Sequence, residues 1–194
     1  MGRGSSGIST GAAGQPGGSA KFKKTLKLVE DGIKGNKVES AICVDANGNI
    51  LFNTSDNAAQ SVAFTPAQVQ QAYGQTLTHN HPHGYYFSKE DINAARVMNL
   101  KQLRATTPDG RVFVLEHTAP GAQTGALYRA YVSAMNSTAQ QATAQAVANA
   151  PMTALGNQKQ LNHLISLEHT KILNHWLTDN AKNYGFEFRE EKIK

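Results

Sequence analysis

Cysteine is nearly absent from this chain of 194 residues, which contains Cys43 alone, in the apolar run "SAICVDA". A single cysteine cannot form an intramolecular disulfide, and it excludes the zinc sites that are built from several cysteines. Any metal ion in this protein would therefore be held by histidine, aspartate or glutamate side chains.

Long apolar runs are missing as well. No stretch approaches the roughly 18 consecutive apolar residues that a membrane span needs, and the N-terminus lacks the apolar centre of a secretory signal. We therefore expect a soluble, cytoplasmic protein with no membrane span.

Charged residues make up 17% of the chain, and the positive ones are in excess, which gives a formal net charge of +5 and a pI near 9.3. Part of this excess lies in the cluster "KFKK" and in Lys27, Lys34 and Lys37. Because no arginine-rich or aromatic-interleaved stripe accompanies these lysines, the pattern argues against nucleic acid as a partner. It favours a solvated surface.

The composition changes twice along the chain. Residues 1–20 are Gly/Ser-rich with almost no apolar mass, so this segment cannot offset its chain entropy and is expected to be a disordered tail. Residues 21–118 alternate short apolar strands with helices, which predicts an α+β core with a mixed sheet flanked by helices. Residues 119–194 consist mostly of helix-forming sequence, which predicts a helical extension.

Local signals place the elements of the core. "VESAICVDANGNILFNTS" has two apolar runs around Asn-Gly, which predicts a hairpin. "FTPAQVQQAYGQ" predicts a short helix capped by Thr65, and "QTLTHNHP" a strand that stops before Pro82. A second helix is expected after Ser88, and "LRATTPDGRVFVLEH" predicts two more strands around a turn.

The extension contains two long stretches, residues 124–150 and 157–185, which are expected to be helices separated by Pro151. The tail "FEFREEKIK" could add an edge strand. The second helix carries histidines at intervals of six residues, namely His163, His169 and His175. This interval turns successive side chains by about 240° around the helix, so we expect them not to share a metal ion.

The stretch "LTHNHPHGYYFSKEDI", residues 77–92, concentrates the side chains that can bind a metal. On a strand, His79 and His81 project from one face, and Asp91 in the first turn of the next helix can point back at them. Three protein ligands around zinc leave the fourth position for water, which is typical of a catalytic site. The spacing alone leaves an alternative open, in which Ser88 and Asp91 cap the helix and the histidines form a polar exit from the strand.

The motifs "THNHP" and "FSKEDI", preceded by Glu39, resemble the JAB/JAMM (MPN) metallopeptidase family, in particular its prokaryotic and phage members. The resemblance extends from about Val38 to Glu116. It implies a JAB/MPN-like fold, with His79, His81 and Asp91 as ligands of a catalytic Zn²⁺.

The same resemblance implies hydrolysis of an amide bond in a protein or peptide by a metallopeptidase or isopeptidase, in a bacterial cell or a phage-infected host cell. Glu39 is expected to take a proton from the catalytic water and pass it to the leaving amine, and Ser88 to donate to the oxyanion. Candidates for substrate contact lie in the loop between the ligands, namely His83, Tyr85 and Tyr86.

Two alternatives belong to other functional classes. The first is a catalytically silent MPN-like interaction module of a phage or prophage protein, which docks on a protein partner through the C-terminal helices. The second is an HNH-type nuclease, suggested by the literal His-Asn-His and the basic pI. A nuclease of that type needs its histidines distributed over a hairpin and a helix, and it leaves Glu39, Ser88 and Asp91 unexplained.

Overall fold

The computed structural model describes residues 18–56, 62–118 and 121–193. Over these residues the protein is α+β, with a six-stranded mixed sheet, flanking helices and a helical C-terminal part, which confirms the predicted fold class. Residues 1–17 of the predicted disordered tail, which was residues 1–20, lie outside the described residues.

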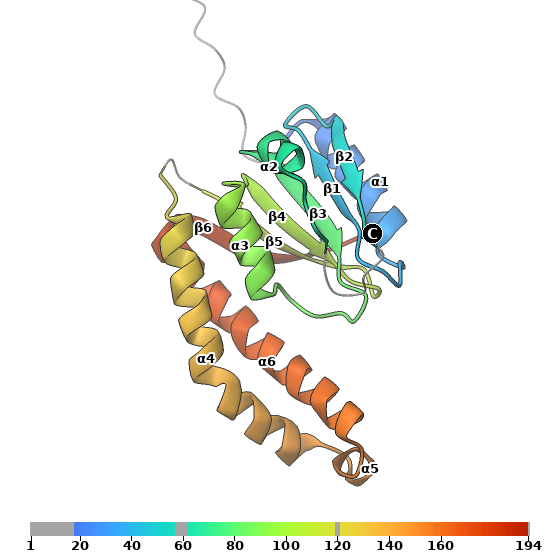
Figure 1. The fold of residues 1–194 in the computed structure, drawn as a ribbon, viewed down its shortest axis with the longest axis vertical. Helices are drawn as coiled ribbons and strands as arrows, with labels where there is room; N and C mark the ends of the chain where they lie inside the picture. The colour runs from blue at the N-terminus through green and yellow to red at the C-terminus, as the bar shows by residue number, and fades with distance from the viewer. Residues whose placement is uncertain (1–17, 57–61, 119–120, 194) are drawn as a thin grey trace, which may run out of the picture.

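The sheet has the strand order β2-β1-β3-β4-β5-β6 (Figure 1). Neighbouring strands are antiparallel except for β3 and β4, which are parallel. Both predicted hairpins are present, and the predicted edge strand, β6, pairs with β5, so the end of the chain completes the sheet. The strands are β1 (Ala41–Val44), β2 (Ile50–Thr54), β3 (Thr76–Asn80), β4 (Gln102–Thr106), β5 (Arg111–His117) and β6 (Phe186–Lys192).

The helices that the sequence predicts are present, and two of them begin with the same device. Thr65 before α2 and Ser88 before α3 each accept a hydrogen bond from the third helical amide, and the third residue's side chain returns one, which is a capping box. The helices are α1 (Ala20–Ile33), α2 (Pro66–Ala72), α3 (Lys89–Val97), α4 (Thr124–Asn149), α5 (Met152–Leu155), α6 (Gln158–Asn180) and the 3₁₀ turn η1 (Ala181–Tyr184).

Helix α1 is present in the structure, but the sequence analysis did not predict it. Its lysines are exposed, as expected, but apolar residues recur between them at helical spacing and cover one face of the sheet beside β1. Ser19 caps this helix, so the last residues of the predicted tail take part in ordered structure. The small core under α1 consists of Phe22, Leu26, Val29, Ile33, Ile42 and Val44.

A buried ion pair fixes α1 to the sheet. Glu30 on α1 lies 2.5 Å from the Nε of Arg104 on β4, and it also accepts a hydrogen bond from Thr78 on β3. Arg104 makes a second ion pair, at 2.7 Å, with Glu191 on β6. One guanidinium therefore connects α1 with both the centre and the edge of the sheet.

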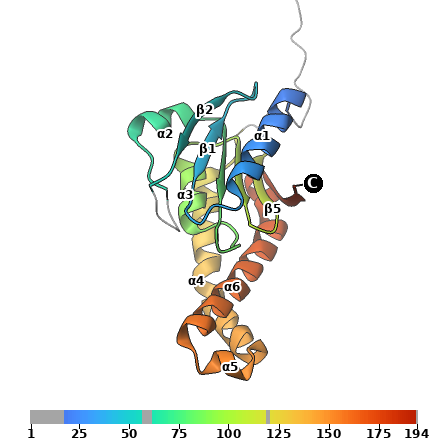
Figure 2. The ribbon, with the colours of Figure 1, turned by 90° about the vertical axis from the view of Figure 1, so that its right-hand side faces the viewer.

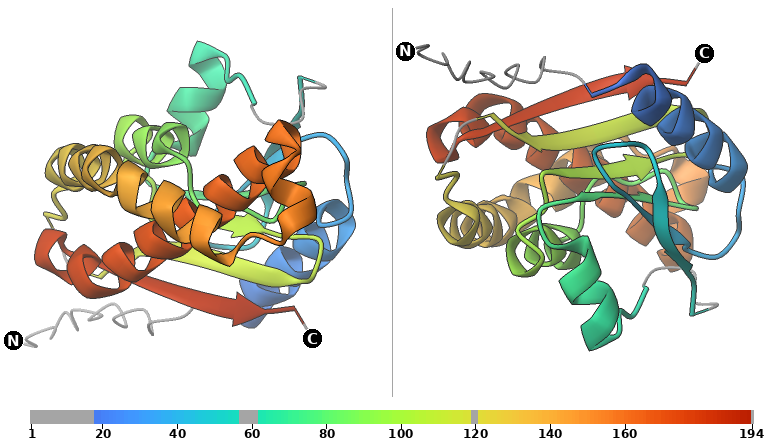
Figure 3. Two further views of the ribbon diagram at one scale, coloured as in Figure 1. Left: turned by 90° about the horizontal axis from the view of Figure 1, so that it is seen from below. Right: turned by 90° about the horizontal axis from the view of Figure 1, so that it is seen from above.

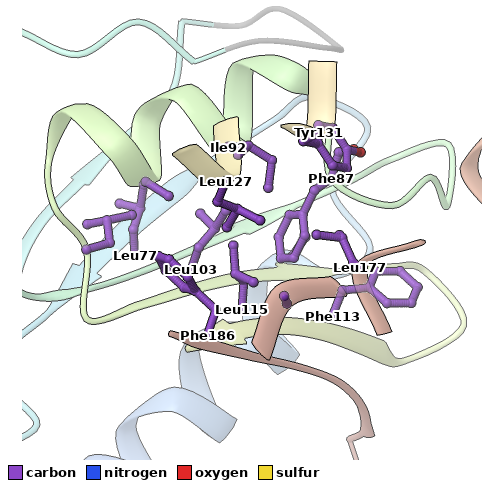
Figure 4. Packing of buried hydrophobic residues seen from close by; sticks show 14 of the residues in the cluster. Leu77, Phe87, Ile92, Leu103, Phe113, Leu115, Leu127, Tyr131, Leu177 and Phe186 are labelled. Carbon is purple, nitrogen blue, oxygen red and sulfur yellow. The ribbon is translucent and has the colours of Figure 1, made fainter. Parts of the chain in front are cut away.

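The larger core lies on the opposite face of the sheet, beneath α2, α3, α4 and α6, and Figure 3 shows α1 and α2 on opposite sides of the sheet. Because side chains alternate along β3, Leu77 points into this core and His79 follows on the same face. Residues from the predicted extension share this core with the strands. Figure 4 shows Leu77, Phe87, Ile92, Leu103, Phe113, Leu115, Leu127, Tyr131, Leu177 and Phe186 converging there.

Helices α4 and α6 pack along each other and extend away from the sheet as an arm, with α5 at its far end (Figures 1 and 2). No helix in the described part of the chain has the length and apolar character to cross a membrane.

Three histidines on α6 were predicted not to share a metal ion. Among the described residues they belong to no cluster of potential metal ligands; they are His163, His169 and His175.

Candidate metal centre

The fold brings four of the predicted site residues together at one end of β3. His79 lies on β3, and His81 follows just beyond the strand end. Glu39 lies two residues before β1, the strand that pairs with β3, and Asp91 lies in the first turn of α3. Each of the four residues offers one ligand atom, and these atoms lie within 4.8 Å of one another.

The atoms converge at distances that suit a metal ion. The Nε2 atoms of His79 and His81 lie 2.8 Å apart. Asp91 Oδ1 is 3.0 Å from His79 Nε2, and Asp91 Oδ2 is 3.3 Å from His81 Nε2. Ligands at the usual zinc bond lengths in a tetrahedron are about 3.3 Å apart, so an ion fits here with shifts of a few tenths of an ångström.

A backbone contact fixes the protonation of the His81 ring. Its Nδ1 lies 2.6 Å from the carbonyl oxygen of Tyr85, and because a carbonyl can only accept, Nδ1 carries the proton. In the neutral ring the Nε2 lone pair then faces Asp91, which is the orientation that a metal ligand requires. The Nδ1 of His79 is buried and has no hydrogen-bond partner among the described residues. A contact of this kind therefore orients the His81 ring but not the His79 ring.

The surroundings of Asp91 favour positive charge. Burial raises the pKa of the Asp91 carboxyl, but the His79 and His81 rings lower it more, and the net pKa lies well below its usual value. Burial lowers the pKa of His81, but Asp91 and the Tyr85 carbonyl together raise it by more, so the net pKa lies above its usual value. Both shifts arise from the attraction between the Asp91 carboxylate and the positive charge of a protonated imidazole ring beside it.

Glu39 adds a second carboxyl group, which is buried, with 7% of the residue's surface exposed. Burial raises the pKa of Glu39, and the charge of Asp91 raises it further, while the two histidines act in the opposite direction. With both carboxylates ionised and both histidines neutral, the site carries two buried negative charges, which one divalent cation would balance. The cluster of Glu39, His79, His81 and Asp91 could therefore hold a metal ion.

Ser88 serves the helix cap and the candidate site together. Its backbone N–H and its hydroxyl donate to Asp91 Oδ2 at 2.7 and 2.8 Å, and the Asp91 N–H donates back to Ser88 Oγ at 3.1 Å. The capping box thus orients the Asp91 carboxylate toward the histidines. In this arrangement the Ser88 hydroxyl proton points at Asp91, and the predicted donation to an oxyanion stays a prediction.

The candidate substrate residues lie in the loop between the ligands, but their side chains take separate directions. His83 is exposed, with its ring 5.9 Å from that of Tyr85. The Tyr85 hydroxyl hydrogen-bonds to Nδ1 of His163 on α6. The centroids of the Tyr86 and Phe113 rings lie 4.1 Å apart, so Phe113 covers part of the surface of the Tyr86 ring. Their role in substrate contact stays a prediction.

Asn80, between the two histidines, is a residue that the sequence analysis missed. Its Oδ1 accepts from the Ser40 amide at 2.8 Å, and its Nδ2 donates to the carbonyl oxygens of Asn36 and Val38 at 3.2 and 3.1 Å. These contacts hold the backbone segment that carries Glu39. An asparagine between the two histidines, at the end of a predicted strand, is the signal that could have identified it, because asparagine is disfavoured in strands.

Comparisons of the chain with protein-family models, with curated proteins and with solved structures found no significant match. The geometry of the four side chains is therefore the main basis for a functional conclusion.

The two capping boxes allow a matched test of the contact between Ser88 and Asp91. We expect Ser88→Ala and Thr65→Ala each to destabilise the metal-free protein by about 1 kcal/mol, because each removes a helix cap. We expect Ser88→Ala alone to weaken binding of a divalent metal, by roughly tenfold, because it removes a hydrogen bond that orients a ligand. Chemical denaturation and competition with a chromophoric chelator measure the two effects. Equal metal affinity in both variants would contradict this role of Ser88.

Proposed function

We propose that this protein is a zinc-dependent hydrolase of the JAB/JAMM (MPN) type, which cleaves an amide bond in a protein or peptide. The observation that carries the proposal is the position of Glu39, whose carboxyl group lies within 4.8 Å of the three candidate ligands. A capped polar turn would need Ser88 and Asp91 but not a glutamate from the distant segment before β1. The resemblance of the motifs to that family supports the same conclusion.

The donor set supports zinc as the metal. Two imidazole nitrogens and carboxylate oxygens are ligands that Zn²⁺ accepts, and the Irving–Williams order favours zinc over manganese and ferrous iron. When bound, the ion would polarise the substrate carbonyl and lower the pKa of a water molecule toward about 7.

The residues of the chain then have separate tasks. His79, His81 and Asp91 hold the ion. Glu39 accepts a proton from the attacking water and delivers it to the leaving amine. Ser88 keeps Asp91 in position through its backbone N–H and its hydroxyl, and for the proposed donation to the oxyanion the hydroxyl proton would turn away from Asp91. The resemblance to phage and prokaryotic members supports a cytoplasmic location in a bacterial or phage-infected cell.

A second function, that of a silent interaction module, is favoured by the far end of the arm. Met152 and Leu155 on α5 are 84% and 41% exposed, and Val147 near the end of α4 is 44% exposed. A module of a phage or prophage protein could use this apolar tip to dock on a protein partner while the sheet serves as a scaffold.

Metal content tests the site itself. Elemental analysis of the purified chain should find about one equivalent of zinc, and the double variant His79→Ala, His81→Ala should contain none, because two of the three proposed ligands are removed. The matched control is His175→Ala, which removes an exposed histidine from α6. Equal, trace metal in the parent and the double variant would contradict the proposal. Nuclease activity that disappears in the double variant would favour the HNH alternative.

Glu39→Gln tests the catalytic assignment. The amide is isosteric with the carboxyl group but cannot take a proton, so the variant should keep its zinc and lose at least 100-fold in turnover. The measurement uses quenched-fluorescent peptides and lysine isopeptides as substrates, with zinc content determined on the same samples. Normal turnover in the variant would show that Glu39 is not the base. A zinc-loaded parent that cleaves none of them would favour the interaction module.

A further inference from the structure

The loop of residues 82–87 joins His81 to the cap of α3, and its backbone takes part in the metal centre. A tight turn at Gly84, with φ of +74°, brings the Gly84 amide to the His81 carbonyl at 3.0 Å. This turn returns the chain so that the Tyr85 carbonyl meets Nδ1 of His81 at 2.6 Å. The orientation of the His81 ring therefore depends on where the backbone of Tyr85 lies.

The arm formed by α4 and α6 holds this loop at two points. The Tyr85 hydroxyl lies 2.7 Å from Nδ1 of His163 on α6. The hydroxyl of Tyr131 on α4, which is fully buried, donates to the Phe87 carbonyl at 2.5 Å. Tyr85 thus contacts the metal centre through its backbone and the arm through its side chain.

We propose that His163 is a positioning residue for the metal centre, acting through Tyr85 on the ring of His81, an inference that rests on the proposed metal function. His163 lies 78 residues after Tyr85 in the sequence. It contacts the Tyr85 hydroxyl, and the Tyr85 carbonyl in turn contacts the ring of His81, so two hydrogen bonds connect His163 to a proposed ligand. The arm thereby sets the geometry of the metal centre.

Tyr85 is the part of the loop that most needs an external anchor. Phe87 is buried in the main core, and the Tyr86 ring packs against Phe113, so both are held by apolar contacts. Tyr85 is only partly buried, and the polar end of its side chain reaches α6. Loss of this hydrogen bond leaves the Tyr85 backbone freer to move and the His81 ring less well oriented.

The affinity for zinc and the spectrum of the cobalt-substituted protein test this inference. His163→Ala and Tyr85→Phe should each weaken zinc binding, measured by chelator competition, by about 3-fold to 10-fold, less than the loss of a partner that contacts a ligand directly. The double variant should bind no more weakly than Tyr85→Phe, because that substitution already removes the hydroxyl that His163 contacts. The visible absorption of Co²⁺ in the site should shift in all three, because it reports ligand geometry.

Two further variants separate positioning from general effects on the arm. His163→Asn keeps a polar atom near the position of Nδ1 and should restore the affinity and the cobalt spectrum of the parent. His175→Ala removes another exposed histidine from the same helix and should change neither.

The inference is overturned if His163→Ala matches His175→Ala in zinc affinity and cobalt spectrum while the parent binds zinc. A parent that binds no zinc overturns the proposed function and this inference together. Because His163 is exposed, circular dichroism should show the same helix content in every variant.

Discussion

The carboxylate of Asp91 is the group on which the arrangement of the site depends. Its two oxygens lie 3.0 Å and 3.3 Å from the Nε2 atoms of His79 and His81, and one of them also accepts two hydrogen bonds from Ser88. A single side chain thereby joins the start of α3 to the end of β3. Because this charge is largely removed from water, with 13% of the Asp91 side chain exposed, nearby positive charge stabilises it, and the second carboxyl group, of Glu39, increases that effect.

Elements with local signals were predictable from the sequence. The Asn-Gly hairpin, the caps at Thr65 and Ser88, and the shared face of His79 and His81 each depend on residues a few positions apart. Helix α1 also has a local signal, its apolar spacing, which its many lysines obscured. The Glu30–Arg104 and Tyr85–His163 contacts join residues 74 and 78 positions apart, so they depend on tertiary packing that no local pattern specifies.

The change in composition after residue 118 predicts a helical extension, and the structure shows why that extension is not independent of the core. The sheet face that carries His79 needs apolar cover, and Leu127 of α4 and Leu177 of α6 provide part of it. Strand β6 then completes the sheet beside β5. The arm is therefore packed against the elements that hold the candidate ligands.

X-ray absorption at the zinc edge of the zinc-loaded protein identifies the atoms that are bound to the ion. We expect nitrogen and oxygen neighbours at about 2.0–2.2 Å, with the outer-shell scattering of two imidazole rings from His79 and His81. A sulfur neighbour at about 2.3 Å, which would have to come from Cys43, or a spectrum without imidazole scattering, would contradict it.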